Sequence, residues 1–233
     1  MTFVTGVQNS LCGKIVHMFE SIVHYFSNHS SEFFVALWQH VLIASIALVV
    51  AFLIAFPLGV LSAGNKVVRS FITGIFSTLR VIPSLALLFL IVVLTGSVGF
   101  PVAAFALTVL AVPPILINTT LAFSQLPTAP LEAARALGLT RTQTFWRIKV
   151  PLAAPLLFAG AKTAATEVIA SATLAAFVGG GGLGTIIFTG LGLMRNDLLV
   201  IGGFSVAILS LTTLALLNLS ERRLIPWFYL DKS

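Results

Sequence analysis

Charged residues are scarce in this sequence. They make up 9% of its 233 residues, whereas hydrophobic residues make up 58%, and an average soluble domain contains roughly 25% charged residues. A chain with so little charge cannot cover its surface with groups that water solvates well. The composition therefore excludes an ordinary water-soluble domain and predicts an integral membrane protein in contact with a lipid bilayer.

Cysteine is almost absent, because Cys12 is the single one in the chain. One cysteine can form neither an intramolecular disulfide nor a cysteine-based metal cluster. The histidines all fall in the N-terminal fifth of the sequence, without the spacing of metal ligands. These absences argue against a metal site and against an intramembrane enzyme.

Long basic stretches are also missing, although the net charge is +6. No basic run is interleaved with aromatic residues, so no nucleic-acid partner is expected. The first residues lack a charged segment followed by an apolar core and a cleavage site, so no removable signal peptide is expected. The basic residues instead stand between apolar runs, as they do in cytoplasmic loops of membrane proteins.

Several uncharged runs are long enough to cross a membrane, which takes about 20 apolar residues for roughly 30 Å of hydrocarbon. The uncharged run from residue 81 to residue 131 is long enough for two crossings, joined at a turn-rich segment at residues 95–101, and the first of these crossings is expected to begin near residue 71. The expected spans are 36–61, two within 71–131, 152–178 and 198–219. The sequence therefore predicts an all-α, polytopic transmembrane bundle of about five spans.

Positive charge is concentrated in alternate segments between these spans. The basic segments contain Lys66, Arg69 and Arg80, then Arg135, Arg141, Arg147 and Lys149, and finally Arg222, Arg223 and Lys232. The other segments contain only Lys14 and Arg195. By the positive-inside rule, an N-terminal tail at 1–33 lies outside, a membrane domain covers 34–222, and a C-terminal tail at 223–233 is cytoplasmic.

The cytoplasmic loop at 123–155 has the pattern of folded structure. Pro130 suits the first position of a helix, and Glu132 would then complement the helix dipole from the first turn. Gly138 can end this helix in the left-handed conformation. The pattern predicts a short helix that ends at a glycine turn.

A second short helix is expected directly after that turn. Thr140 and Gln143 match a capping box at its start, and Pro151 is expected to stop it. Two interpretations of this helix pair stay open on physical grounds. It is either a knob that docks on a soluble partner, or an interfacial pair whose arginines contact lipid phosphates.

One motif in this loop resembles the EAA signature of the membrane subunits of ATP-binding-cassette importers. It consists of Glu132, Ala133, Ala134, Gly138, Ile148, Val150 and Pro151. The resemblance covers about residues 41–219 and implies the type I importer permease fold, which methionine-importer permeases share. It also implies that the loop docks in a groove of the ATPase subunit through Glu132, Ala133, Ala134, Arg135, Gly138 and Pro151.

Further segments resemble one branch of these permeases, the importers of glycine betaine, choline and carnitine. They are residues 80–88, 172–176 and the glycine-rich 179–184. Methionine-importer permeases share a similar Ile-Pro element and glycine-rich run, so an amino acid such as methionine stays an alternative substrate. The chain departs from the pattern at Ile117, where related permeases often have arginine.

The resemblance implies an assembly in the cytoplasmic (inner) membrane of a bacterium. Two membrane subunits, either two copies of this chain or the chain and a paralogue, would join two ATPase subunits and an external substrate-binding protein. ATP and Mg²⁺ would be bound by the ATPase, so this chain is expected to be non-catalytic and without a cofactor. A stand-alone secondary transporter or channel, driven by an ion gradient, is the alternative.

Glu167 is the main candidate for the translocation path. It lies inside an apolar span, where an ionisable group costs several kcal/mol and is a functional candidate by default. Its carboxylate can attract a quaternary ammonium group. The structural alternatives are a salt bridge with Lys162 and a position at the subunit interface.

Four further residues are assigned to the path. Pro83 is expected to kink or interrupt the second span, which either places it and Ser84 beside a cavity that can satisfy the freed backbone groups or forms a purely structural kink. Asn118 and Thr119 are polar residues within a span. They either line the path or form hydrogen bonds between helices.

Overall fold

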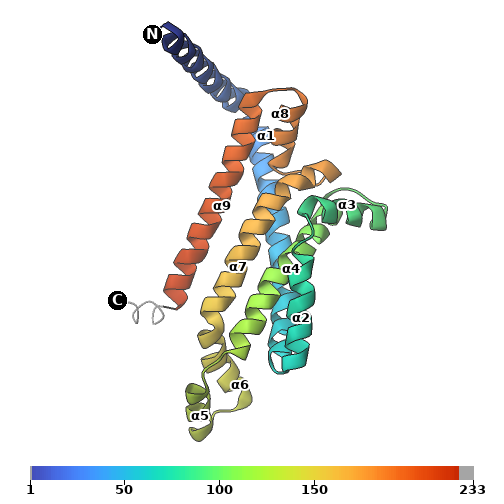
Figure 1. Ribbon diagram of the computed structural model, residues 1–233, viewed down its shortest axis with the longest axis vertical. Coiled ribbons are helices and arrows are strands. Elements are labelled where there is room, and N and C mark those ends of the chain that lie inside the picture. The colour runs from blue at the N-terminus through green and yellow to red at the C-terminus, as the bar shows by residue number, and fades with distance from the viewer. Residues whose placement is uncertain (1, 226–233) are drawn as a thin grey trace.

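The computed structural model describes residues 2–225 of the chain, with side chains from residue 20 onward. All regular elements in this part are helices (Figure 1). Four of them are long and apolar enough to cross a membrane, and a bent helix pair makes up to five spans. The expected all-α bundle of about five spans is confirmed, whereas residues 226–233 of the expected C-terminal tail lie outside the described residues.

Helix α1, Thr2–Ala63, contains the expected first span and extends far beyond it. The segment expected as a tail is helical as well, and the helix bends at His29, where φ is −124° and ψ is 22°. No proline precedes Pro57, so no residue before it lacks the backbone N–H that a helix needs. In Figure 1 the N-terminal part of α1 projects beyond the bundle.

The second span is broken into two helices. Helix α2, Lys66–Leu79, and helix α3, Ser84–Thr95, meet at an angle of 95°. Pro83 caps α3 with φ −58° and ψ 133°, and its ring disfavours the helical conformation of the residue before it. The interruption expected at Pro83 is confirmed, and Figure 1 shows α3 turning away from the bundle.

Helix α4, Phe100–Ser124, is the centre of the bundle and packs between α1 and α7, Val150–Ala172. Two glycines permit this close packing. A Cβ at Gly59 would lie 2.7 Å from the Thr119 side chain, and one at Gly160 would lie 2.8 Å from that of Asn118. Small residues let membrane helices approach closely and gain van der Waals contact.

The end of the bundle opposite α5 and α6 in Figure 1 is built around a glycine turn. A 3₁₀ segment, Thr173–Val178, follows α7, and the turn then leads to α8, Gly184–Gly192. The buried His40 of α1 accepts a hydrogen bond from the Leu183 N–H through Nδ1 at 3.3 Å, and its Nε2 lies 3.0 Å from the Ile169 carbonyl oxygen. This histidine joins α1, α7 and the turn.

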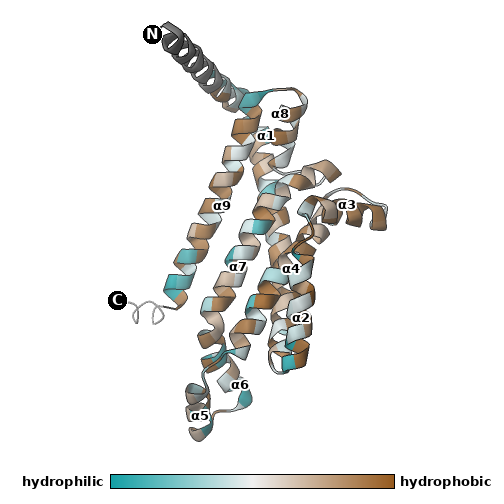
Figure 2. Cartoon of the chain, viewed as in Figure 1, coloured by the Kyte–Doolittle hydropathy of each residue, from teal (hydrophilic) through white to brown (hydrophobic). Residues whose placement is uncertain are grey.

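The last span, α9, Asn196–Leu224, runs back along the bundle with much of its surface uncovered. Within its most apolar window only 17% of the residues are buried inside the protomer. Figure 2 shows apolar residues along most of α9 and along α3, with hydrophilic residues gathered near the ends of α9. These apolar faces suit contact with lipid or with another membrane subunit.

Candidate functional site

The loop between α4 and α7 folds as a knob, Thr128–Lys149, that projects beyond both helices (Figure 1). It begins with α5, Thr128–Ala136, two residues before the expected start. Pro130 is therefore the third helical residue instead of the first, and Glu132 lies beyond the first turn. The earlier start is possible because the first turn has no intrahelical acceptors for its N–H groups, so a proline there removes no helix hydrogen bond.

The turn after α5 has the expected left-handed conformation. Gly138 has φ +71°, and its N–H donates to the Arg135 carbonyl at 3.0 Å. The N–H of Leu139 donates to the Ala134 carbonyl at 3.1 Å. These two bonds complete a Schellman motif, which satisfies the last carbonyls of the helix and sets the direction of the chain that follows.

The second short helix begins at the expected capping box. In α6, Arg141–Thr144, the Thr140 hydroxyl accepts from the Gln143 N–H at 3.3 Å. The Gln143 side chain in turn accepts from the Thr140 N–H at 2.9 Å. The capping box is therefore confirmed, with both of its hydrogen bonds present.

The expectation that Pro151 stops this helix is wrong. The chain continues through a π-helical turn, Phe145–Lys149, directly into α7, where Pro151 is the second residue. The Val150 N–H donates to the Phe145 carbonyl, five residues back. This wider turn accommodates a ring that would otherwise meet the carbonyl four residues before it.

The knob is anchored to the bundle by aromatic contacts and presents a mixed outer surface. Phe145 stacks on Phe123 of α4 with ring centroids 5.6 Å apart, and Phe123 meets Phe56 of α1 at 6.0 Å. The side chains that face outward from the knob are Glu132, Ala133, Arg135, Leu137, Arg141, Trp146 and Arg147. Leu137 is 79% exposed on a loop outside the apolar spans, which suits a surface that another protein covers.

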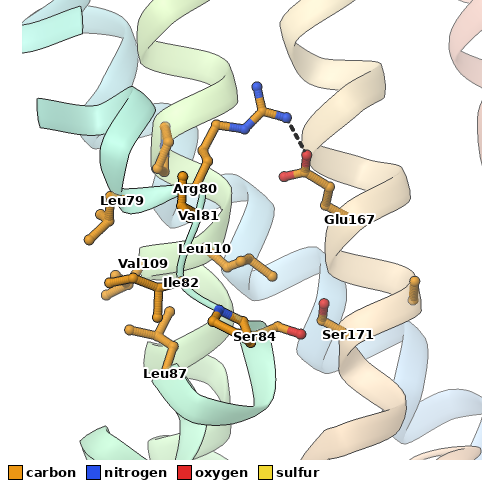
Figure 3. A pocket seen from close by; sticks show the side chains of 13 residues that line it. Leu79, Arg80, Val81, Ile82, Ser84, Leu87, Val109, Leu110, Glu167 and Ser171 are labelled. Atoms are coloured by element: carbon orange, nitrogen blue, oxygen red, sulfur yellow. Dashed lines mark hydrogen bonds and ion pairs between the residues drawn. The ribbon is translucent and has the colours of Figure 1, made fainter. Parts of the chain in front are cut away.

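A cavity of about 410 Å³ lies where the second span is broken (Figure 3). It is lined by the break between α2 and α3, by α4 and by α7, through Leu79, Arg80, Val81, Ile82, Pro83, Ser84, Leu87, Val109, Leu110, Pro113, Glu167, Ala170 and Ser171. Ligand pockets usually measure roughly 300–1,000 Å³. The cavity is therefore large enough for a small solute.

An ion pair spans one side of this cavity. The Arg80 guanidinium donates from Nη2 to Oε1 of Glu167 at 2.5 Å, and the two side chains are 41% and 32% exposed. The pairing expected between Glu167 and Lys162 is not formed, because five residues separate them and they point about 140° apart around the helix. Lys162 instead pairs with Glu221 of α9.

Arg80 therefore does not flank a cytoplasmic loop, as its positive charge suggested. Helix α2 has 14 residues, which at 1.5 Å per residue carry the chain about 21 Å from Lys66. Where α2 begins a span at Lys66, that distance lies within the roughly 30 Å of hydrocarbon in a bilayer. The break at Pro83 brings the Arg80 side chain to Glu167.

Two prolines of α4, one of which lines the same cavity, interrupt the hydrogen bonding of this helix. Proline has no N–H, so Pro113 and Pro114 cannot donate the usual helix hydrogen bonds to Val109 and Leu110. Both of these residues line the cavity. Freed backbone groups at membrane depth occur where the backbone is covered by protein or lines a cavity.

Comparisons with known proteins show which family has this fold and this loop. Residues 55–226 match the family model of the binding-protein-dependent transport system inner membrane component. The chain belongs to this family. It is thus a permease of the ATP-binding-cassette type and a non-catalytic transport subunit, and the resemblance drawn from the EAA motif is confirmed.

Two curated relatives match the permease over nearly its whole length. The carnitine transport permease protein OpuCB of Listeria monocytogenes is 36% identical over 207 residues, which is 89% of this chain and 94% of the relative. The choline transport system permease protein OpuBB of Bacillus subtilis is 36% identical over 88% of this chain and 94% of its own.

A solved structure has the same fold. The inward-facing MetNI methionine ABC transporter matches with a TM-score of 0.63 and 26% identity, over 83% of this chain and 94% of that one. This match confirms the expected type I permease fold.

The permease brings some of the expected path residues together and separates others. Pro83, Ser84 and Glu167 all line the cavity. Asn118 donates from its side chain to the Pro114 carbonyl at 2.8 Å, and Thr119 is buried against Gly59 of α1. Neither lines this cavity, and their place in the translocation path stays a prediction.

The sequence interpretation missed Arg80 as the partner of Glu167 and missed the proline pair of α4. A signal for both was available. Arg80 stands three residues before Pro83 in a segment that is otherwise apolar, and Pro113 and Pro114 interrupt an uncharged run. An isolated charge beside a helix-breaking residue in a span indicates a site at membrane depth.

Proposed function

We propose that the chain is the permease subunit of an importer for osmoprotectants, and that glycine betaine, choline or carnitine crosses the membrane through it. The observation that carries this proposal is the 36% identity, over nearly nine tenths of the chain, to permeases named for carnitine and choline transport. The carboxylate of Glu167 in a cavity at membrane depth supports it. A negative charge there compensates the positive head group that these solutes share.

We propose further that the knob transmits the ATPase cycle to the spans. Its exposed outer surface carries Glu132, Ala133, Arg135 and Gly138 of the EAA segment. Its base joins α7 without a flexible linker, since α6, the π-helical turn and α7 are consecutive. A rigid element of this kind passes on a displacement that a flexible loop would absorb.

The proposed assembly contains a second permease subunit, a pair of cassette ATPases that bind ATP and Mg²⁺, and an extracytoplasmic binding protein. The uncovered apolar faces of α3 and α9 suit contact with lipid and with a second subunit. The knob and the C-terminal end of α9 would face the cytoplasm, because Arg135, Arg141, Arg222 and Arg223 lie at that end.

Co-purification and uptake test the proposal together. The tagged chain is expressed with its genomic neighbours in cells without other osmoprotectant uptake, and purified in mild detergent. We expect a cassette ATPase to co-purify and the cells to accumulate labelled glycine betaine, choline or carnitine in an ATP-dependent way. Uptake of labelled methionine in their place would move the substrate to an amino acid, and uptake that continues without ATP would support a secondary transporter.

The coupling role makes a prediction at Glu132. Its side chain is exposed, so Glu132→Ala removes no buried contact and leaves the amount of permease in the membrane unchanged. We expect solute-stimulated ATP hydrolysis by the purified complex to fall several-fold. The matched control is Glu32→Ala, which removes an exposed carboxylate from α1 far from the knob. Equal hydrolysis in wild type and Glu132→Ala would exclude Glu132 from coupling.

A further inference from the structure

The ion pair across the cavity has the charge pattern of a zwitterion. We propose that Arg80 and Glu167 are the two ends of a solute-binding site: Glu167 binds the quaternary ammonium group, Arg80 binds the carboxylate, and their mutual ion pair is the empty, closed form of the site. This inference rests on the proposed function and deepens it. It makes Arg80 the residue that favours zwitterionic glycine betaine and carnitine over cationic choline.

The Glu167 end suits a cation that has no hydrogen atoms to donate. A quaternary ammonium group binds by charge and by contact of its methyl groups with apolar surface. The cavity offers both, because the carboxylate of Glu167 lies on one side of it and the apolar side chains of Leu87 and Val109 lie across from it (Figure 3).

The Arg80 end suits a carboxylate. Arginine presents five N–H donors in a planar fork that matches a carboxylate in two parallel hydrogen bonds. The bond to Glu167 uses Nη2 and one carboxylate oxygen, so the present contact does not use the whole fork. A solute carboxylate can therefore replace Glu167 as the partner of Arg80 and engage both sides of the fork.

Arg80 is placed so that it can move without unfolding a helix. It follows the last residue of α2 and precedes Ser84, the first residue of α3, by four positions. A change of side-chain rotamer at Arg80 would swing its guanidinium while the N–H groups of Val81 and Ile82 keep their hydrogen bonds to the Thr78 and Leu79 carbonyls. Glu167 is fixed within α7, so opening of the pair separates a mobile cation from a fixed anion.

The two ends together explain a preference among solutes. A zwitterion inserted into the opened pair compensates both charges, whereas choline compensates Glu167 and leaves the Arg80 guanidinium unpaired. An unpaired charge at membrane depth is unfavourable, so the site discriminates against choline through Arg80. Removal of the guanidinium should therefore remove the preference while leaving the cation end intact.

The test compares a zwitterion with a cation as substrates of the whole importer. Uptake of labelled glycine betaine and labelled choline is measured in cells that carry the complete importer with wild-type or variant permease. We expect Arg80→Gln to lower the ratio of glycine betaine to choline uptake by about tenfold or more, mainly through glycine betaine. Glu167→Gln should lower uptake of both solutes.

Matched variants separate this role from a structural one. Lys162→Gln disrupts the other ion pair of α7 and should leave the uptake ratio unchanged, whatever it does to the amount of complex. If Arg80→Gln reduces the amount of complex, the double variant Arg80→Gln/Glu167→Gln serves as a second test, because it leaves neither charge of the pair without a partner. That neutral pair should show no preference for the zwitterion.

Each outcome distinguishes the inference from the proposed function. Wild-type uptake of none of glycine betaine, choline and carnitine would overturn the proposed function itself. Wild-type uptake with a ratio that Arg80→Gln does not change, or an equal loss of both solutes in Arg80→Gln, would overturn the two-ended site alone. Wild-type uptake of choline but not of glycine betaine would also overturn it.

Discussion

At the residue scale, Gly138 determines how the two helices of the knob meet. Its φ of +71° lies in the left-handed region, which costs a residue with a side chain roughly 1–2 kcal/mol. A Cβ at this position would meet no atom within 4 Å. A substitution here therefore acts through backbone strain and not through a steric clash.

Gly138→Ala should weaken coupling without removing the permease from the membrane. We expect strain of about 1 kcal/mol at the turn, a displaced α5, and a several-fold loss of solute-stimulated ATP hydrolysis in the reconstituted complex. Gly192→Ala is the control, because its Cβ also meets open space and its φ is not positive. A similar loss of stimulation in both variants would exclude the left-handed turn as the cause.

Lys162 and Glu221 form a second residue-scale feature, an ion pair between α7 and α9. Their side chains are 21% and 7% exposed, so water solvates little of either charge. When one partner of a buried pair is removed, the other is left uncompensated, which costs about 3–5 kcal/mol. When both are replaced by apolar residues, the change is often neutral.

A double-mutant cycle tests this pair. Lys162→Met and Glu221→Met should each lower the Tm of the detergent-solubilised permease, followed by thermal loss of its monodisperse peak. The double variant should recover most of the loss, because no charge is left unpaired. If the two losses simply add, the residues do not interact in the folded protein.

At the scale of elements, the aromatic contacts of Phe56, Phe123 and Phe145 connect the knob to two spans. They join α1, α4 and the π-helical turn in a continuous contact. Aromatic pairs of this kind contribute about 0.5–1.5 kcal/mol each beyond the area that they bury. The knob therefore moves with α1 and α4 and not only with α7.

Phe145→Ala should separate hydrolysis from transport. Loss of the stacking contact loosens the knob, so we expect basal ATP hydrolysis to persist while its stimulation by solute and the uptake of solute fall together. Phe105→Ala is the comparison, because Phe105 lies on α4 with its side chain 57% exposed and away from the knob. An unchanged ratio of uptake to hydrolysis in Phe145→Ala would show that the aromatic contacts do not carry coupling.

At the scale of the whole molecule, the two ends of the bundle differ in chemistry. One end carries the knob with its arginines, and the other carries the glycine turn and the connection from α8 to α9, where Arg195 pairs with Asp197 at 2.6 Å. The asymmetry of basic residues predicts that the knob end is cytoplasmic.

Cysteine labelling in intact cells tests this orientation. In a Cys12→Ser background, Leu137→Cys and Leu193→Cys each introduce one thiol at a position that is 79% and 62% exposed, respectively. A membrane-impermeant maleimide should label residue 193 in intact cells, and residue 137 only after the membrane is opened. The reverse pattern would invert the topology.

The sequence alone determined the class of the protein and much of the knob. Runs of uncharged residues must be helical in a bilayer, because no other open structure satisfies the backbone there. Gly138 and the capping box of Thr140 and Gln143 were predictable for a related reason, since local backbone chemistry decides both of them. The EAA residues likewise indicated the family before any contact was known.

Only the tertiary structure decided which charges meet. The positive charge of Arg80 suggested a cytoplasmic loop. The closeness of Glu167 and Lys162 in the sequence suggested a pair between them, whereas Glu167 pairs with Arg80 and Lys162 pairs with Glu221. Sequence separations of 87 and 59 residues link these partners, so the pairings depend on how α2, α7 and α9 pack. The tertiary structure also decided that the chain stays helical through Pro151, because the π-helical turn before it admits a proline that local sequence rules treat as the end of a helix.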